Sequence, residues 1–113
     1  MNLKHHKTLT KEKWLTFPFY KQVIMIANEM NRAGKWIEKN DFLEVRYCYE
    51  RAFELLYLTI STLNDKKKLR ELLRFKEMLA VFYASKLPAP KDNLNLLKVL
   101  IAMDKDSFSL LKI

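Results

Sequence analysis

Two adjacent histidines, His5 and His6, have the side chains best suited to acid–base or metal chemistry, and they are the only histidines in the sequence. A zinc site needs further ligands at suitable spacing, and the single cysteine does not supply them. A serine nucleophile would also depend on one of these two histidines as its base. The segment around them lacks an apolar anchor. We therefore expect residues 1–13 to be flexible, and His5 and His6 to have no catalytic or metal-binding role.

Glu50 and Glu54 have the i, i+4 spacing of carboxylates that share a helix face, and such a pair could serve acid–base catalysis. Arg46 precedes Glu50 by one turn and Arg51 precedes Glu54 by three residues, so surface ion pairing explains the same pattern. Di-iron bundles need Glu-x-x-His motifs, which are missing here. Cys48 lies on an apolar face, where burial disfavours the thiolate. The sequence thus predicts no catalytic residue, no metal site and no cofactor.

The composition restricts the architecture that could position these residues. The chain has 113 residues, of which half are apolar and 30% are charged, and its only glycine is Gly34. At this length one domain is expected, spanning residues 1–113. Tight turns and phosphate-cradling loops need backbone conformations that cost other residues free energy. Sandwiches, small barrels, P-loops and dinucleotide folds are therefore disfavoured, and a helical protein remains.

Apolar residues recur at alternating spacings of three and four, which is the pattern of helices that bury one face. Pro18 suits the first position of a helix, because its missing N–H costs nothing there. The first long helix should therefore begin at Phe17-Pro18 and end near Asn40. Asp41 and Glu44 have the spacing of a capping box, which predicts the start of a second long helix.

Asp65 can cap a third long helix, and Asp92 or Asn93 can cap a shorter fourth one. The residue before a proline avoids helical geometry, so residues 87–91, which include Pro88-Ala89-Pro90, are the predicted linker to the last helix. We predict an all-α fold: an antiparallel helical bundle of three long helices plus a shorter fourth helix. Gly34 lies within the first helix, at a cost of about 1 kcal/mol relative to alanine, and close packing against the second helix would explain it.

The positive charge is unevenly distributed. The formal net charge is +8, with +5 over residues 1–40, −2 over residues 41–64 and +4 over residues 65–86. Lysines of this kind can simply keep a very apolar chain in solution. They can also form a basic face for an anionic partner such as a nucleic acid. The densest candidate patch comprises Lys66, Lys67, Lys68, Arg70 and Arg74.

Four aromatic residues do not all fit the main apolar stripes: Trp36, Tyr47, Phe53 and Tyr57. An exposed aromatic set on consecutive turns would suit a protein interface. Alternatively, each ring packs against a second neighbouring helix within the bundle. The short fourth helix is expected to leave an apolar groove uncovered, and grooves on bundles bind amphipathic helices.

The stretch NRAGKWIEKNDF, residues 31–42, resembles the flagellar secretion chaperone family FliS. In that family a helix ends in an alanine, followed by an apolar pair, a charged run and an aspartate. The next helix carries a basic residue plus alanine, as in Arg51-Ala52, and ends in a leucine and a polar turn, as in Leu63-Asn64. The resemblance covers residues 30–82 and implies a non-enzymatic bundle that grips helical segments of an export client.

The sequence therefore favours a non-enzymatic interaction protein, chaperone- or adaptor-like, that binds a helical segment of a protein partner in an apolar groove. A basic nucleic-acid-binding accessory bundle that uses residues 66–76 is the alternative. A homo-oligomer that pairs through the second helix is a third possibility. With one cysteine, no visible secretion signal and no long apolar run, we expect a cytoplasmic protein without a membrane span.

Overall fold

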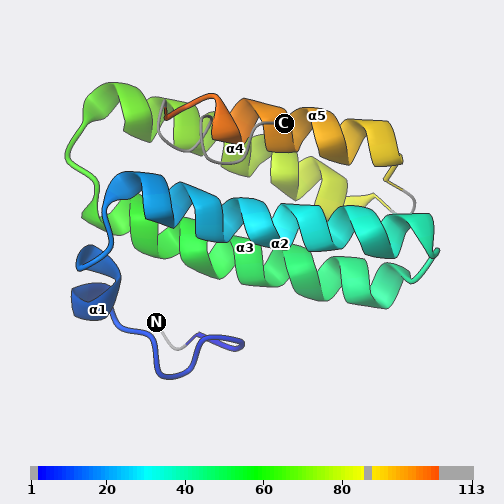
Figure 1. Cartoon of the computed structure of the whole chain (residues 1–113), viewed down its shortest axis with the longest axis horizontal. Coiled ribbons are helices and arrows are strands. Elements are labelled where there is room, and N and C mark those ends of the chain that lie inside the picture. Colours follow the sequence, from blue (N-terminus) through cyan, green and yellow to red (C-terminus); the bar gives the residue numbers. More distant parts are fainter. Residues whose placement is uncertain (1–2, 86–87, 105–113) are drawn as a thin grey trace.

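The computed structural model describes residues 3–85 and 88–104. These residues form five helices and no strand. The helices are α1 (Lys11–Leu15), α2 (Phe19–Glu38), α3 (Phe42–Thr62), α4 (Lys66–Ala84) and α5 (Pro90–Ile101) (Figure 1). None of them is long and apolar enough to cross a membrane.

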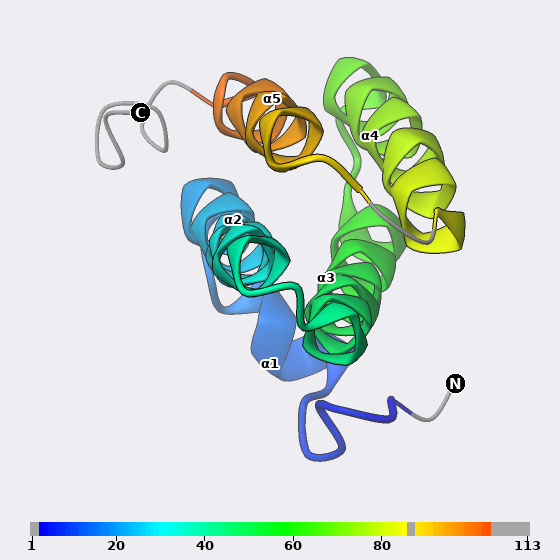
Figure 2. The ribbon, with the colours of Figure 1, turned by 90° about the vertical axis from the view of Figure 1, so that its right-hand side faces the viewer.

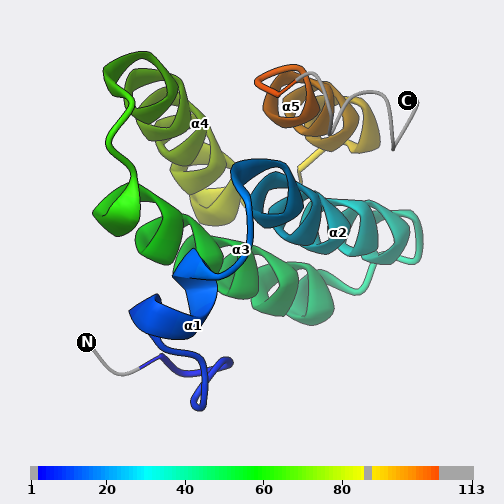
Figure 3. The same ribbon diagram turned by 60° about the vertical axis from the view of Figure 1, so that its left-hand side comes forward.

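The four longer helices run alternately up and down, so that each is antiparallel to the next (Figure 1). Viewed end-on, they form a four-cornered arrangement in which α2 contacts α3 and α5, and α4 contacts α3 and α5 (Figure 2). The prediction of an all-α bundle of three long helices plus a shorter fourth is confirmed. The short α1 is an addition to it and packs on the outer side of α3 (Figure 3).

The core is built from the apolar stripes that the periodicity predicts. Tyr49 and Phe75 are among its largest fully buried side chains. Helices α2 and α3 each bury a long stripe, whereas α4 buries only Leu72, Phe75 and Leu79. Because apolar area removed from water supplies most of the stabilisation, α4 is the least firmly held of the long helices.

Local capping explains the helix starts. The Asp41 carboxylate accepts the Glu44 N–H at 3.2 Å, and that of Asp65 accepts the N–H groups of Lys67 and Lys68 at 3.0 and 3.1 Å. Both predicted N-caps are confirmed, but the capping box is only half formed, because the Asp41 N–H donates to the Trp36 carbonyl and not to the Glu44 side chain. The last helix differs: Pro90 occupies its first turn and Ala89 precedes it, so α5 begins inside the segment predicted as a linker.

Asn93 does not cap α5 but is buried within it, where its side chain forms hydrogen bonds to α2 and α3. Tyr49 Oη donates a hydrogen bond to Asn93 Oδ1 at 2.6 Å, and Asn93 Nδ2 donates to the Met30 carbonyl at 3.0 Å. Gly34 lies beside this bridge, since a Cβ at that position would be 3.2 Å from Asn93 Nδ2. The predicted close contact of Gly34 is real, but its partner is α5 rather than the second long helix.

The N-terminal residues also differ from expectation. Trp14 on α1 is fully buried, and its Nε1 donates to Thr59 Oγ1 of α3 at 2.9 Å. Gln22 Nε2 of α2 donates to the carbonyls of Trp14 and Phe17. Leu3 is buried, and the His5 and His6 N–H groups donate to Glu54, so residues 3–13 of the segment expected to be flexible make specific contacts with the bundle. Residues 1 and 2 of that segment lie outside the described residues.

Candidate functional site

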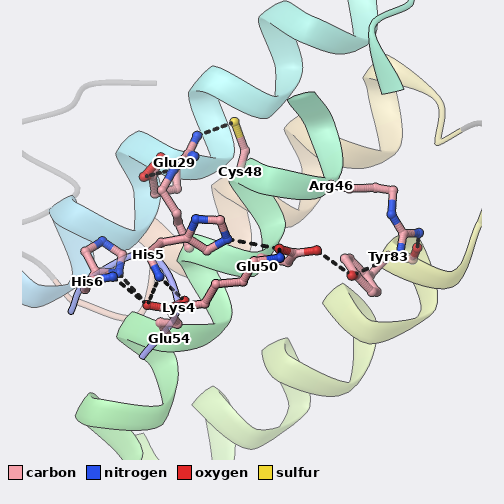
Figure 4. Close-up of polar contacts among 10 residues, drawn as sticks. Lys4, His5, His6, Glu29, Arg46, Cys48, Glu50, Glu54 and Tyr83 are labelled. Atoms are coloured by element: carbon pink, nitrogen blue, oxygen red, sulfur yellow. Dashed lines mark hydrogen bonds and ion pairs between the residues drawn. The ribbon is translucent and has the colours of Figure 1, made fainter. Parts of the chain in front are cut away.

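Residues 3–10 cross the outer face of α3, and we call them the N-terminal clasp. Its main attachment is Glu54, which is only 8% exposed. The Glu54 carboxylate accepts the His5 N–H at 2.8 Å on Oε2 and the His6 N–H at 2.9 Å on Oε1 (Figure 4). His6 Nδ1 lies 3.0 Å from the same Oε1. One buried carboxylate thus binds both successive backbone N–H groups of the clasp.

Glu50, one turn earlier on α3, extends this arrangement toward α4. His5 Nε2 lies 2.9 Å from Glu50 Oε1, and Tyr83 Oη donates to Oε2 at 2.7 Å (Figure 4). Arg46 Nη2 in turn donates to Tyr83 Oη at 3.0 Å, and Lys4 Nζ lies 3.6 Å from Glu50. A continuous set of polar contacts therefore joins the clasp, α3 and α4.

The surroundings of both glutamates favour their charged form. Burial alone would raise the pKa of Glu54, but hydrogen bonds from the backbone N–H groups of His5 and His6 and from the His6 ring outweigh it, and the net pKa is lowered. For Glu50, burial is likewise outweighed by hydrogen bonds from His5 and Tyr83 and by the charge of Lys4. The hydrogen bond to Glu50, followed by burial, raises the pKa of Tyr83.

These contacts correct two predictions. His5 and His6 are anchored, because both bind carboxylates of α3. The glutamates do not pair with the neighbouring arginines on the surface: Arg46 contacts Tyr83, and Arg51 turns to α2. Within the described residues, no group of three or more histidine, cysteine, aspartate or glutamate side chains could hold a metal ion. The arrangement can bind the N–H groups of a peptide backbone.

Arg51 belongs to a second polar contact, between α2 and α3. Its Nε donates to the buried Glu29 at 3.0 Å, and its Nη2 lies 3.3 Å from Cys48 Sγ. Burial raises the pKa of the Cys48 thiol, because the thiolate would be desolvated. Cys48 is therefore a packed thiol, as the sequence predicted.

The four predicted partner-binding aromatics lie in three different places. Tyr47 contacts the His5 ring at 6.0 Å, and Lys11 lies over Tyr57 at 5.4 Å, so both face the N-terminal residues. Phe53 packs edge-on against Tyr83 of α4 at 5.7 Å. Trp36, on α2, packs on the core with Lys39 over its ring. In the described part of the chain, no ring–ring contact joins any two of the four.

An apolar groove of about 410 Å³ opens between α4 and α5. Exposed apolar side chains line both of its walls, with Met78 on α4 and Val99 on α5 each 47% exposed. The sequence predicted a groove left by the short last helix, but not these residues, because both lie off the buried stripes. The full lining comprises Glu71, Arg74, Phe75, Met78, Val99, Ala102 and Met103.

The predicted basic patch divides between two environments. Lys66, Lys67, Arg70 and Arg74 are exposed on α4 and form no ion pair with any residue that the structure describes. Lys68 instead lies over the Phe19 ring of α2 at 4.5 Å. Four of the five cations are thus available to an anionic partner, and Arg74 lies at the rim of the α4–α5 groove.

None of the family models, curated proteins or solved structures compared with the chain matches it.

Proposed function

We propose that this protein is a non-enzymatic, chaperone- or adaptor-like interaction protein that binds an amphipathic helix of a protein partner in the α4–α5 groove. The observation that supports it is the exposure of Met78 and Val99 on facing walls of one apolar groove. Apolar side chains left in water at a groove between helices are typical of helix-binding sites. The resemblance to flagellar secretion chaperones implies the same class of activity.

Charge complementarity favours an acidic partner helix. Arg74 lies at the rim, and Lys67 and Arg70 precede it by about two turns and one turn along α4. Only Glu71 among the groove residues opposes this charge. A helix with an apolar stripe and glutamates or aspartates beside it would match both features. We place the interaction in the cytoplasm, since a buried, unpaired Cys48 suits a reducing compartment.

A synthetic helix with leucines at i, i+3, i+4 and i+7 and glutamates on its flanks is a suitable probe. We expect the full chain to bind it, and Met78→Glu or Val99→Glu to weaken binding at least about tenfold, because each places a charge in the apolar groove. Val81→Glu is the matched control, since Val81 is exposed on α4 but does not line the groove. Isothermal titration calorimetry gives the affinities.

Equal loss of affinity in Val81→Glu would show that the added charge acts at long range and would contradict the groove assignment. A wild-type dimer that Met78→Glu converts to a monomer in sedimentation experiments would assign the groove to a second copy of this chain. A peptide with lysines in place of the glutamates should bind more weakly, and equal binding would remove the role of Arg74.

The exposed, unpaired cations of α4 support a second candidate, a nucleic-acid-binding accessory bundle. Phosphate contacts release counterions, so affinity for single- or double-stranded nucleic acid would fall steeply between about 50 and 200 mM salt. Lys67→Glu with Arg70→Glu should then abolish binding while Met78→Glu leaves it unchanged. Helix-peptide binding in the groove should weaken much less with added salt, because salt screens the contribution of Arg74 but not the apolar contacts. The two candidates therefore separate in one experiment.

A further inference from the structure

The N-terminal clasp is held on α3 by contacts of the kind that bind a separate peptide. Two successive N–H groups that converge on one anion form a concave binding arrangement known from phosphate sites. Here the anion is the Glu54 carboxylate, and the groups are the backbone N–H of His5 and His6. Recognition of backbone N–H groups requires only that a segment adopt this conformation, whichever side chains it carries.

Side chains on either side of Glu54 add selectivity. Leu3 is buried against the core before the two N–H groups, and Leu9 packs against the core after them. The His5 ring lies between Glu50 and Tyr47. The face therefore accepts an apolar residue, then a short segment with histidine or lysine beside two carboxylates, then a second apolar residue.

The clasp can leave this face without opening the bundle. The next anchor along the chain is Trp14 of α1, which is buried and hydrogen-bonded to Thr59 independently of residues 3–10. The clasp also leaves the face incompletely filled, because a cavity of about 630 Å³ remains beside Leu9, Tyr57 and Leu58. Such incomplete filling is expected of a segment that covers the surface of the bundle and is not part of its close-packed core.

We propose that the face of α3 with Tyr47, Glu50, Glu54 and Tyr57 is a binding site for a basic, non-helical segment of a partner protein that adopts the turned conformation of the clasp. Residues 3–10 occupy this site within the same chain and must be displaced by the partner. The site is separate from the α4–α5 groove, so Met78→Glu should not affect it. Charge complementarity supports a basic occupant, because the two carboxylates of the face already bind Lys4, His5 and His6.

The test uses the full chain with His5→Pro and His6→Pro, which removes both N–H donors of the clasp and leaves the α3 face unchanged. The probe is a labelled synthetic peptide of residues 1–10, followed by fluorescence anisotropy. We expect the peptide to bind this variant at least about tenfold more tightly than the wild-type chain, whose own clasp competes at high effective concentration. A probe peptide carrying the same two prolines is the control and should not bind.

Adding Glu54→Gln to the proline variant should abolish peptide binding. Equal binding to wild type and the proline variant, no binding to either, or binding unaffected by Glu54→Gln would each overturn the proposal. A wild-type dimer that the two prolines dissociate would show that copies exchange their clasps, and this too would overturn the assignment to a partner protein.

Hydrogen exchange of the wild-type chain provides a measurement that does not depend on any variant folding. If the clasp leaves the face on its own, the amides of His5 and His6 will exchange through a local opening, faster than the amides of the α2 and α3 cores. Exchange of both amides only at the rate of global unfolding would show that the clasp is inseparable from the fold and would overturn the proposal.

Discussion

Glu54 illustrates how one buried charge can fix a segment far away in the sequence. Its carboxylate accepts hydrogen bonds from His5 and His6, 49 and 48 residues earlier in the chain. A buried carboxylate without such donors would be strongly disfavoured, because its lost hydration would not be replaced. The contacts of the clasp and the burial of Glu54 therefore depend on each other.

Glu54→Gln should lower the free energy of unfolding by about 2 kcal/mol, since hydrogen bonds to a charged acceptor are replaced by bonds to a neutral amide. Chemical denaturation in urea measures this change. Glu77→Gln is the matched control, because Glu77 is exposed on α4 and makes no contact of this kind. A loss of similar size in both variants would contradict the role assigned to Glu54.

The lowered pKa values of Glu50 and Glu54 predict a dependence of stability on pH. A carboxyl whose pKa is lower in the folded protein stabilises the fold above its unfolded pKa, about 4.3, and this contribution disappears as pH falls through the folded value. The groups that contact these carboxylates are Lys4, His5 and His6 of the clasp and Tyr83 of α4. Arg46 of α3 acts only through Tyr83, to whose hydroxyl it donates.

Urea unfolding between pH 7 and pH 3 should therefore show a loss of stability below about pH 4.3 that becomes smaller in the Glu50→Gln, Glu54→Gln double variant. The exchange of the His5 and His6 amides, corrected for intrinsic rates, should show a loss of protection over the same range. An identical acid dependence in the double variant would assign the loss to other carboxylates and contradict this explanation.

At the scale of elements, the short α5 is positioned by one polar bridge as well as by apolar packing. Asn93 joins α5 to Tyr49 of α3 and to the Met30 carbonyl of α2. Both of its hydrogen bonds are buried, and no buried side-chain polar atom lacks a partner in the described part of the chain. The bridge sets how closely α5 approaches Gly34, because Asn93 Nδ2 occupies the space beside it.

Gly34→Ala should lower the free energy of unfolding by about 1 kcal/mol, although helix propensity alone favours alanine by a similar amount. The reason is that the new Cβ would lie 3.2 Å from Asn93 Nδ2, and two hydrogen bonds prevent Asn93 from moving away freely. In an Asn93→Ala background the same substitution should become stabilising. Urea unfolding of all four members of this double-mutant cycle measures the coupling. A stabilising Gly34→Ala in the wild-type background would refute the argument.

At the scale of the whole molecule, the helices are unequally held. Helices α2 and α3 bury long stripes and share the most extensive contact, whereas α4 buries three residues and leaves Leu73, Met78 and Val81 exposed. A helix with little buried apolar area opens at a lower free-energy cost than its neighbours. The proposed helix-binding groove is thus formed partly by the helix best able to adjust to a partner.

Hydrogen exchange followed by mass spectrometry should find the α4 amides exchanging earlier than those of α2 and α3. Their protection should increase when the acidic helical peptide occupies the α4–α5 groove, because binding adds buried area to α4. Equal protection of α4, α2 and α3 in the free protein would show that the three helices open together. It would contradict the prediction that α4 opens at a lower free-energy cost.

Much of the fold follows from local signals in the sequence. The alternating spacing of apolar residues predicts α2, α3 and α4, and Asp41 and Asp65 predict two helix starts, because stripes and caps depend on residues within one or two turns. The prediction of Asp92 or Asn93 as a cap was wrong, since Pro90 begins α5 without a side-chain cap and Asn93 serves a partner on another helix.

The sequence by itself determined the all-α class, the long helices and their buried faces, because periodicity and capping are short-range. Only the tertiary structure decided that His5 and His6 bind Glu54, that Gly34 faces α5 and that Met78 faces Val99 across a groove. Each of these arrangements brings together residues more than 20 positions apart. Whether such residues meet depends on how all the helices pack together, and no local sequence pattern predicts that packing.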